Sequence, residues 1–316
     1  MSRTDDIDVL VSEVGPRDGL QSVDRTMPTE LKYRWIDALT ESGLREIEVG
    51  SFVSPKRLPQ MADTGLVVAH ANGIDDLAVL ALVPNLRGAQ NAIAAGAHSL
   101  SMPVSASREH SQANIGMAPE DAVAQVKEVA DLLQEQPGDN SVEVGISTAF
   151  GCTMEGPIAE DWVIQLALKC AEAGAQSVGL SDTTGSGNPA QVRRLFERLR
   201  RELGDRAGAA HLHNTRGQGL ANVVAALDAG VTTFDSSQAG LGGCPYAPGA
   251  SGNIVTEDLV YLLESMGLRT GIDIDRLVAA RSVVAEGLPG EPLYGHVPDA
   301  GVHRGFTYAA ALAEAK

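Results

Sequence analysis

Four segments of the chain repeat one pattern of polar and apolar positions. They are "ESGLREIEVG", "AAGAHSLSMPV", "EAGAQSVGLSD" and "DAGVTTFDSS", and each reads as a helix end, a glycine and an apolar run. Gly43, Gly96, Gly174 and Gly230 suit the residue after a helix, where a positive φ costs glycine little. Their spacings of 53, 78 and 56 residues are near multiples of a unit of about 27 residues, a plausible length for one strand and one helix.

Filling the gaps between these segments predicts eight strands that alternate with amphipathic helices. The strands are expected near residues 8–13, 45–50, 78–83, 98–103, 142–148, 176–181, 208–213 and 231–236. In "NPAQVRRLFERLRREL" the apolar residues follow helical spacing, with Asn188 as N-cap and Pro189 at the first helical position. Apolar strands between such helices indicate a parallel sheet covered by helices.

Eight units favour a closed (β/α)8 TIM barrel over residues 1–266, in the α/β class. The alternative is an open doubly wound sheet, but the chain has no GxGxxG or Walker A loop to support it. Residues 267–316 are expected to form a short extension that packs on the barrel and is no independent domain.

Composition restricts the function without naming it. Hydrophobic residues make up 44% of the 316, enough for a large core, and no apolar run approaches the roughly 20 residues of a membrane span. The N-terminus lacks a signal-peptide pattern, and three unpaired-looking cysteines suit a reducing cytoplasm. A net charge of −17 argues against nucleic acid and anionic membranes as partners, and requires local cations and backbone N–H groups for any anionic ligand.

The chemically unusual residues fall at predicted strand ends, which in a barrel meet on one rim. They are Arg17, Asp18 and Gln21 after the first strand, Glu48 and Ser51 in the second, Asp182 in the sixth, His211 and His213 in the seventh, and Cys244 and Asn253 after the eighth. This rim is therefore the predicted active site.

A metal site is one interpretation of the two histidines. Residues two apart in a strand share a face, so His211 and His213 lie side by side, although such a pair more often packs or hydrogen-bonds. Asp18 and Asn253 at the same rim strengthen the metal interpretation. Imidazole, carboxylate and amide ligands without thiolate suit Mg²⁺ or Mn²⁺ better than a closed zinc site, and zinc stays an alternative.

Two further residues allow more than one interpretation. Cysteine is usually a small buried hydrophobe, which we expect of Cys170, whereas Cys244 lies in the glycine-rich loop "AGLGGCPYAPG" and is equally compatible with a chemical role. Asp182, in "SDTTG", either contacts the ligand or caps a turn.

Together these stretches resemble the 3-hydroxy-3-methylglutaryl-CoA lyase family, among the metal-dependent lyase and aldolase barrels. The similarity rests on "EVGPRDGLQ", "SFVSPKRLPQMAD", "GLSDTTGSGNP", "GQGLANVVAALDAGV" and "DSSQAGLGGCPYAPGASGNIVTEDLVYLLE", which span most of residues 9–266. The resemblance implies cleavage of hydroxymethylglutaryl-CoA to acetyl-CoA and acetoacetate, with Mg²⁺ or Mn²⁺ as cofactor and CoA as part of the substrate. A homodimer is the expected assembly.

The resemblance also implies roles for individual residues. Its metal ligands are Asp18, His211, His213 and Asn253. Arg17 is expected to contact the thioester carbonyl, Cys244 to take part in proton transfer, and Glu48 and Asp182 to lie near the substrate, with Gln21 and Ser51 as further substrate contacts. His211 and Asp18 are both candidates for the base that removes the hydroxyl proton.

Several positions depart from the family pattern. Asn214 and Arg216 replace an acid and an aromatic residue after the histidine pair, Glu143 stands where arginine is common, and His110 lies in a divergent loop. These departures either alter the pocket for another substrate, such as a citramalyl-type or longer-branched acyl-CoA, or reflect neutral drift. A condensing synthase is a third alternative, but such enzymes usually carry a larger C-terminal domain.

Overall fold

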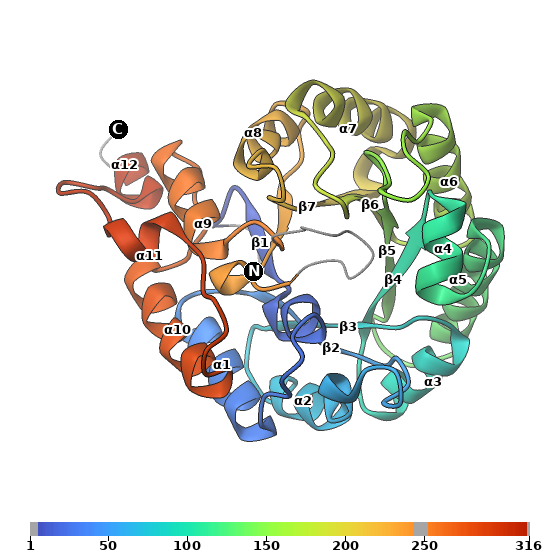
Figure 1. The fold of residues 1–316 in the computed structure, drawn as a ribbon, viewed down its shortest axis with the longest axis horizontal. Coiled ribbons are helices and arrows are strands. Elements are labelled where there is room, and N and C mark those ends of the chain that lie inside the picture. The colour runs from blue at the N-terminus through green and yellow to red at the C-terminus, as the bar shows by residue number, and fades with distance from the viewer. Residues whose placement is uncertain (1–5, 243–251, 315–316) are drawn as a thin grey trace.

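The strands close into a barrel, as the glycine repeat predicts. The computed structural model describes residues 6–242 and 252–314, and each strand pairs in parallel with the next until β8 pairs with β1 (Figure 1). The strands are β1 (Leu10–Glu13), β2 (Glu46–Ser51), β3 (Ala78–Leu82), β4 (Ser99–Ser105), β5 (Ser141–Ser147), β6 (Ser177–Asp182), β7 (Ala207–Leu212) and β8 (Thr233–Ser236). The β1–β8 pairing excludes the open doubly wound sheet.

Helices surround the barrel and follow the strands in sequence. They are α1 (Thr29–Glu41), α2 (Thr64–Ala71), α3 (Leu86–Ala94), α4 (Arg108–Ile115), α5 (Pro119–Gln134), α6 (Glu160–Glu172), α7 (Pro189–Leu203), α8 (Gly219–Asp228) and α9 (Thr256–Ser265), with short helical turns η1 (Gly15–Gly19), η2 (Pro59–Met61), η3 (Gly204–Arg206) and η4 (Gln238–Gly240). None of the helices in the described ranges is both long and apolar enough to traverse a lipid bilayer.

Local signals in the sequence act as expected. Gly43, Gly96, Gly174 and Gly230 all have positive φ, between 86° and 110°, the conformation that ends a helix at low cost for glycine. On α7 the side chain of Asn188 accepts a hydrogen bond from the Gln191 N–H. The apolar stripe of that helix is wholly buried against the barrel, through Val192, Leu195, Phe196, Leu199 and Leu203.

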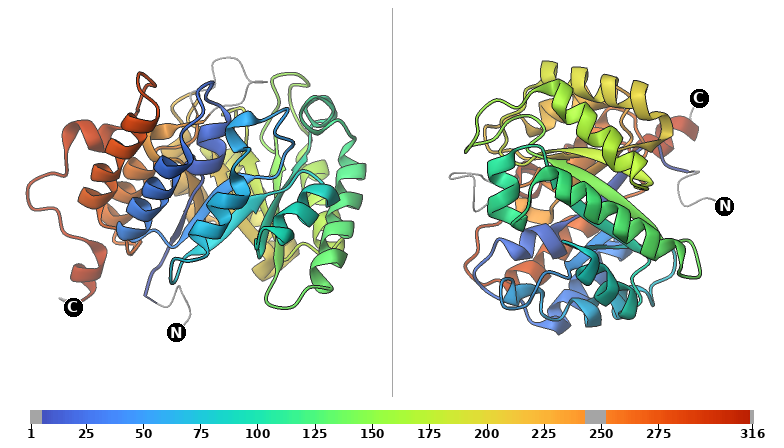
Figure 2. Two further views of the ribbon diagram at one scale, coloured as in Figure 1. Left: turned by 90° about the horizontal axis from the view of Figure 1, so that it is seen from below. Right: turned by 90° about the vertical axis from the view of Figure 1, so that its right-hand side faces the viewer.

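The C-terminal extension lies along one side of the barrel, next to α1 and α9 (Figures 1 and 2). It contains α10 (Ile274–Gly287), α11 (His296–Ala300) and α12 (Ala309–Glu314). Its start is fixed by a hydrogen bond of 2.8 Å from the Asp8 N–H to the Arg269 carbonyl and one of 2.7 Å from the Asp273 N–H to the Ser42 carbonyl. The extension therefore packs on the barrel.

The strands separate two environments. On β5, Val142, Val144 and Ile146 are buried, while Glu143, at the alternate position, lines a cavity inside the barrel. Most (β/α)8 barrels fill this interior with branched apolar side chains. Here much of the barrel interior is polar, and the site described below is built from its charged groups.

Candidate functional site

A buried carboxylate organises the loop that follows β1. Glu13 accepts hydrogen bonds from the Gly15 N–H at 2.7 Å, the Gln238 N–H at 2.9 Å and the Thr256 hydroxyl at 2.7 Å. Burial raises the pKa of Glu13 to about 8. Because these three donors belong to the loops after β1 and β8 and to the start of α9, Glu13 fixes the two loops relative to each other.

The turn η1, held by Glu13, places Asp18 against His211 in β7 and His213 just beyond its end. The Nε2 atoms of His211 and His213 are 3.1 Å apart, and the His211 Nε2 atom is 3.9 Å from the Asp18 Oδ2 atom. One ligand atom from each of these residues lies within 4.8 Å of the other two. The structure thus brings together three of the four predicted metal ligands from opposite ends of the chain.

Asn253, the fourth predicted ligand, joins the same cluster. Residues 213 and 253 form an isolated β-bridge beyond the end of β7, and the Asn253 amide donates to the Asp18 carboxylate at 2.7 Å. The Asn253 Oδ1 atom and the His213 Nδ1 atom are buried without a hydrogen-bond partner. Buried polar atoms normally have a partner, and the unpartnered Asn253 oxygen, on the side chain that contacts Asp18, is available to a cation.

The donor atoms fit a divalent cation. Metal–ligand bonds of about 2.1 Å at right angles place two ligand atoms about 3.0 Å apart, close to the 3.1 Å between the imidazole nitrogens. The His211 Nδ1 atom lies 3.0 Å from the Asp235 Oδ2 atom, which fixes the ring and directs Nε2 toward Asp18. Histidine ligands to metals usually have such a carboxylate partner.

The ionisation of Asp18 and His213 favours ligation. Burial lowers the pKa of His211, but Asp235 and Asp18 raise it above its ordinary value. Burial raises the pKa of Asp18, but Arg17 and the histidines outweigh it and lower this pKa to about 2. Burial and the neighbouring His211 lower the pKa of His213 to about 3. An ionised carboxylate and a neutral imidazole are the forms that bind a cation.

Arg17 lies beside this cluster and is paired on both sides. Its guanidinium contacts the carboxylates of Asp18 and Glu48, and Glu48 also accepts from the Ser101 hydroxyl. Burial lowers the pKa of Arg17, but the two carboxylates raise it further and keep the side chain charged. A fixed positive charge therefore lies beside the predicted metal position. Arg17 and Glu48 both lie at the rim, where the sequence predicts them.

The remaining predicted residues are distributed around the rim. Gln21 donates to Asp18 at 2.8 Å, whereas Ser51 is buried and lines a separate pocket of about 400 Å³ between the loops after β2 and β3. Asp182 accepts from the Ser186 and Gly187 N–H groups at 2.8 and 3.1 Å, and burial raises its pKa to about 6. It therefore caps a turn, as one of its two interpretations proposed.

The three cysteines differ. Cys170 is fully buried on α6, and burial raises its pKa to about 12, so its interpretation as a core residue is confirmed. Cys152 is buried in the loop after β5. Cys244 lies outside the described residues, and its role stays a prediction.

The model of the HMGL-like family matches residues 8–284, which is most of the chain. The chain belongs to the HMGL-like family.

Several relatives of this chain are named as hydroxymethylglutaryl-CoA lyases. A hydroxymethylglutaryl-CoA lyase of Bacillus subtilis is 41% identical over 288 residues, covering 90% of this chain and 94% of the relative. The cytoplasmic 3-hydroxy-3-methylglutaryl-CoA lyase of Rattus norvegicus is 39% identical, and the match covers 88% of this chain and 80% of the relative. The mitochondrial enzyme of Gallus gallus is 40% identical and covers 89% and 93%.

Solved structures of HMGL-like proteins share the fold. The HMG-CoA lyase of Bacillus subtilis superposes with a TM-score of 0.87 at 39% identity, covering 92% of this chain and 97% of that one. An HMG-CoA lyase of A. baumannii, in complex with coenzyme A and 3-methylmalate, superposes with a TM-score of 0.88 at 39% identity. The match covers 96% of this chain and 99% of that one.

The structure shows the contacts of the residues that depart from the HMGL-like pattern. Asn214 accepts from the Gly219 N–H at 3.0 Å, and Arg216 donates to the Thr184 and Gly185 carbonyls at 2.8 and 2.9 Å. His110 is buried with its Nδ1 atom 2.9 Å from the Ser105 hydroxyl. Each makes contacts within the protein that hold rim loops in place.

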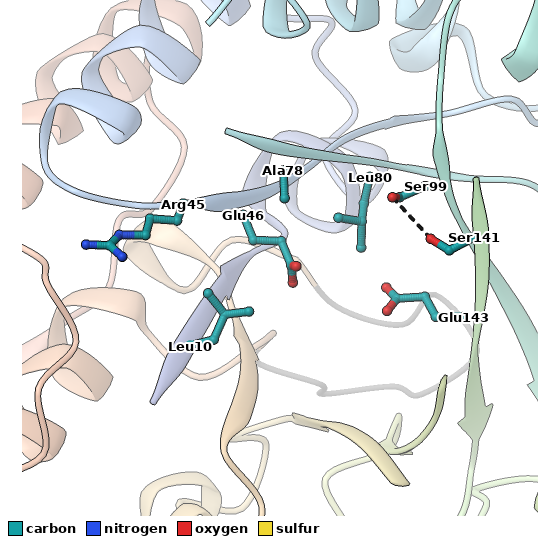
Figure 3. A pocket seen from close by; sticks show the side chains of 8 residues that line it. All are labelled: Leu10, Arg45, Glu46, Ala78, Leu80, Ser99, Ser141 and Glu143. Carbon is teal, nitrogen blue, oxygen red and sulfur yellow. Dashed lines mark hydrogen bonds between the residues drawn. The ribbon is translucent and has the colours of Figure 1, made fainter. Parts of the chain in front are cut away.

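Glu143 is different from the other three departures. It lines a cavity at the N-terminal ends of the strands, opposite the rim (Figure 3). This departure from the family pattern therefore lies at the floor of the barrel and not in the loops that surround the cluster.

Two contributors to the site escaped sequence reasoning. Asp235, the partner of His211, occupies an inward position of β8, directly opposite His211 in the β7–β8 register. Ser101 supports Glu48 from β4. The alternation of "TFDSS" along β8 could have indicated Asp235, but its partner depends on the register between strands.

Proposed function

We propose that this chain is a divalent-metal-dependent carbon–carbon lyase that cleaves 3-hydroxy-3-methylglutaryl-CoA to acetyl-CoA and acetoacetate. The observation that carries the proposal is the cluster of Asp18, His211 and His213 beside the buried guanidinium of Arg17. The names of relatives about 40% identical over most of this chain support it. Binding of an acyl-CoA is supported by the related complex with coenzyme A.

The residues of the cluster suit the bond changes of this reaction. Cleavage removes the proton of the 3-hydroxyl group, breaks the C2–C3 bond and moves the electron pair onto the thioester, giving the acetyl-CoA enolate and a ketone. Asp18, His211, His213 and Asn253 would hold Mg²⁺ or Mn²⁺, which when bound lowers the pKa of a ligated hydroxyl group.

Arg17 has the charge that the enolate requires. Its guanidinium, fixed by Glu48, would hold the thioester oxygen as negative charge develops there, an interaction stronger in the transition state than in the ground state. His211 or Asp18 would accept the hydroxyl proton, and Cys244 would deliver a proton to the enolate carbon. The base would then be protonated and the thiol ionised, and transfer of one proton from the base to the thiolate would restore both.

The direct test is a cleavage assay over a panel of branched 3-hydroxyacyl-CoA thioesters, with Mg²⁺ or Mn²⁺ and with a chelator. We expect acetoacetate from hydroxymethylglutaryl-CoA, lost on chelation and restored by metal. Preference for a citramalyl-type or longer-branched thioester would replace the substrate and keep the reaction class. Unchanged turnover after complete metal removal would contradict the mechanism.

Assembly and location stay predictions. We expect a homodimer, to be measured by sedimentation of the full chain. The cytoplasm is the predicted compartment, and relatives carry names from both the cytoplasm and the mitochondrion.

A further inference from the structure

The C-terminal extension contacts the loop after β8 at the turn η4, which leads toward the predicted metal site. This turn contains Ala239, which has a φ of 60° and a ψ of 14° although it is not a glycine. A residue with a side chain adopts this left-handed conformation only at a cost, so its surroundings must hold it there. Ala239 is completely buried, and both of its backbone polar groups are bound by residues outside the turn.

Four hydrogen bonds form a closed ring around Ala239. The Ala239 N–H donates to the Glu257 Oε2 atom at 3.1 Å, and the Ala239 carbonyl accepts from the Tyr294 N–H at 2.9 Å. The Arg281 Nη1 atom joins these two partners, because it donates to the Glu257 Oε1 atom at 2.7 Å and to the Tyr294 carbonyl at 2.9 Å. Arg281, on α10, therefore ties α9 to the extension at the point that fixes η4.

The ion pair within this ring is buried. The Glu257 side chain has no exposed surface, and that of Arg281 is 14% exposed, so solvent ions screen the pair little. Burial raises the pKa of Glu257 above its ordinary value, although Arg281 opposes the rise. Because one nitrogen atom of Arg281 serves both acceptors, the position of the guanidinium sets the spacing between Glu257 and Tyr294.

The residue after η4 connects this ring to Asn253. The carbonyl of Leu241 accepts from the Asn253 Nδ2 atom at 3.3 Å, and the same nitrogen donates to the Asp18 carboxylate at 2.7 Å. These two acceptors occupy the nitrogen end of the amide. The Oδ1 atom at its other end has no hydrogen-bond partner among the described residues. The Leu241 carbonyl therefore helps to decide which way the Asn253 oxygen points.

Close packing leaves little room for adjustment between η4 and Asn253. A Cβ atom added at Gly252 would lie 1.9 Å from the Gly242 carbonyl oxygen and 2.5 Å from the Gly240 carbonyl oxygen. The residue before Asn253 thus lies directly against the end of η4 and the residues that follow it. A shift of η4 must therefore displace Asn253 as well.

We propose that Arg281 is a positioning residue for the metal site. By holding Ala239 through Glu257 and Tyr294, it orients the Asn253 amide so that the amide oxygen is available to the cation. Arg281 acts through the backbone of η4 and not by contact with the metal. The inference rests on the proposed function, since it requires Asn253 to be a metal ligand, and it gives the C-terminal extension a part in that site.

The test measures Mn²⁺ affinity by isothermal titration in the wild-type chain and in Arg281→Met. Methionine keeps much of the apolar stem and removes the donors that join Glu257 to Tyr294. We expect the dissociation constant to rise about 10-fold, as for other residues that orient a metal ligand from outside the coordination shell. Circular dichroism checks that each variant is folded at the temperature of the titration. Arg281→Gln, which is too short to reach both acceptors, replaces Arg281→Met if that variant does not fold.

Glu264→Gln is the matched control for loss of stability. Glu264 is a second buried acid on α9, at the far end of that helix from Glu257. It accepts from the Thr270 and Ala309 N–H groups at 2.7 and 2.8 Å, so it also holds the extension to the barrel. We expect a lower Tm in Glu264→Gln and in Arg281→Met, because each change leaves a buried polar group without its partner. Only Arg281→Met should lose Mn²⁺ affinity.

Arg281→Lys is the conservative variant. A single lysine nitrogen can donate to both acceptors, as the Nη1 atom does, so this variant should recover most of the Mn²⁺ affinity that Arg281→Met loses. Hydrogen exchange over residues 237–242, measured by mass spectrometry without metal, gives a readout of η4 itself. We expect faster exchange there in Arg281→Met and wild-type exchange in Glu264→Gln.

Three results would count against the proposal. Equal Mn²⁺ affinity in the wild-type chain and in Arg281→Met would overturn it. An equal loss of affinity in Arg281→Met and Glu264→Gln would also overturn it, because general loosening of the extension would then explain the effect. A wild-type chain that binds no Mn²⁺ would contradict the proposed function together with this inference, whereas the first two results leave the proposed function standing.

Discussion

The two ends of the barrel surround their carboxyl groups differently. At the C-terminal rim Asp18 has Arg17, Gln21 and Asn253 as donors, and Glu48 has Arg17 and Ser101. At the N-terminal floor Glu143 has no donor among the described residues and faces other acids. Donors and cations keep a buried carboxylate ionised, and this chain supplies them where a metal ion and a substrate are expected.

The hydrogen-bond donors at the rim come from distant parts of the sequence. The donors of Asp18 come from the loops after β1 and β8, more than 230 residues apart. Such an arrangement holds charges at fixed positions before substrate binds, which is the condition for electrostatic stabilisation of a transition state.

The largest effect is expected from removing a carboxylate at the rim. Asp18→Ala deletes a predicted metal ligand and leaves Arg17 with one acidic partner, so cleavage should fall to the limit of detection and metal stimulation should vanish. Turnover with and without Mg²⁺ measures both. Asp24→Ala, exposed in the same loop, is the control. Full stimulation by Mg²⁺ in Asp18→Ala would remove this residue from the ligand set.

Arg17→Lys tests whether the rim needs the geometry of the guanidinium or only its charge. Lysine cannot contact Asp18 and Glu48 at once with a planar fork, so kcat should fall by about 10²–10³-fold with a smaller change in KM. Arg25→Lys, at an exposed position, controls for the substitution itself. A rise in KM with kcat unchanged would instead indicate a role in binding alone.

Asp235→Asn tests the support of a predicted ligand. The amide cannot hold the His211 ring as the carboxylate does, so metal affinity should weaken by about 10–100-fold while the fold is retained. Isothermal titration with Mn²⁺ measures the affinity. Asp228→Asn, on the exposed end of α8, should bind Mn²⁺ as the wild-type chain does. Unchanged affinity in Asp235→Asn would show that His211 is positioned without it.

The smallest effect at the rim is expected from the floor. Glu143→Gln should leave both turnover and Mn²⁺ affinity at pH 7 unchanged, because Glu143 lies at the opposite end of the barrel from the cluster of Asp18, His211 and His213. Steady-state cleavage and metal titration of the purified variant measure this separation of the two ends. A large loss of turnover with intact stability would show that the floor and the rim are coupled through Asp235.

Sequence reasoning reached the barrel because local rules determine it. Glycine at Gly43 and Gly174 ends helices wherever the chain must take positive φ, and the apolar run after each one marks a strand. It also reached the histidine pair, since the period of a strand places His211 and His213 on one face.

What the sequence could not supply was the register between strands. Asp235 meets His211 because β7 and β8 pair at one offset and no other. Glu143 follows the same logic, since it is the third residue of β5 and so lies near the floor, although its chemistry suggested a place in the substrate pocket. Depth along a strand decides which end of the barrel a side chain serves.

The most direct measurement is the number of Mn²⁺ ions bound per chain by the wild-type protein and by His213→Ala, read by electron paramagnetic resonance at neutral pH. We expect one ion for the wild-type chain and none for the variant, with the circular dichroism of the fold retained. Equal binding by both chains would mean that His213 holds no metal and would contradict the proposed ligand set.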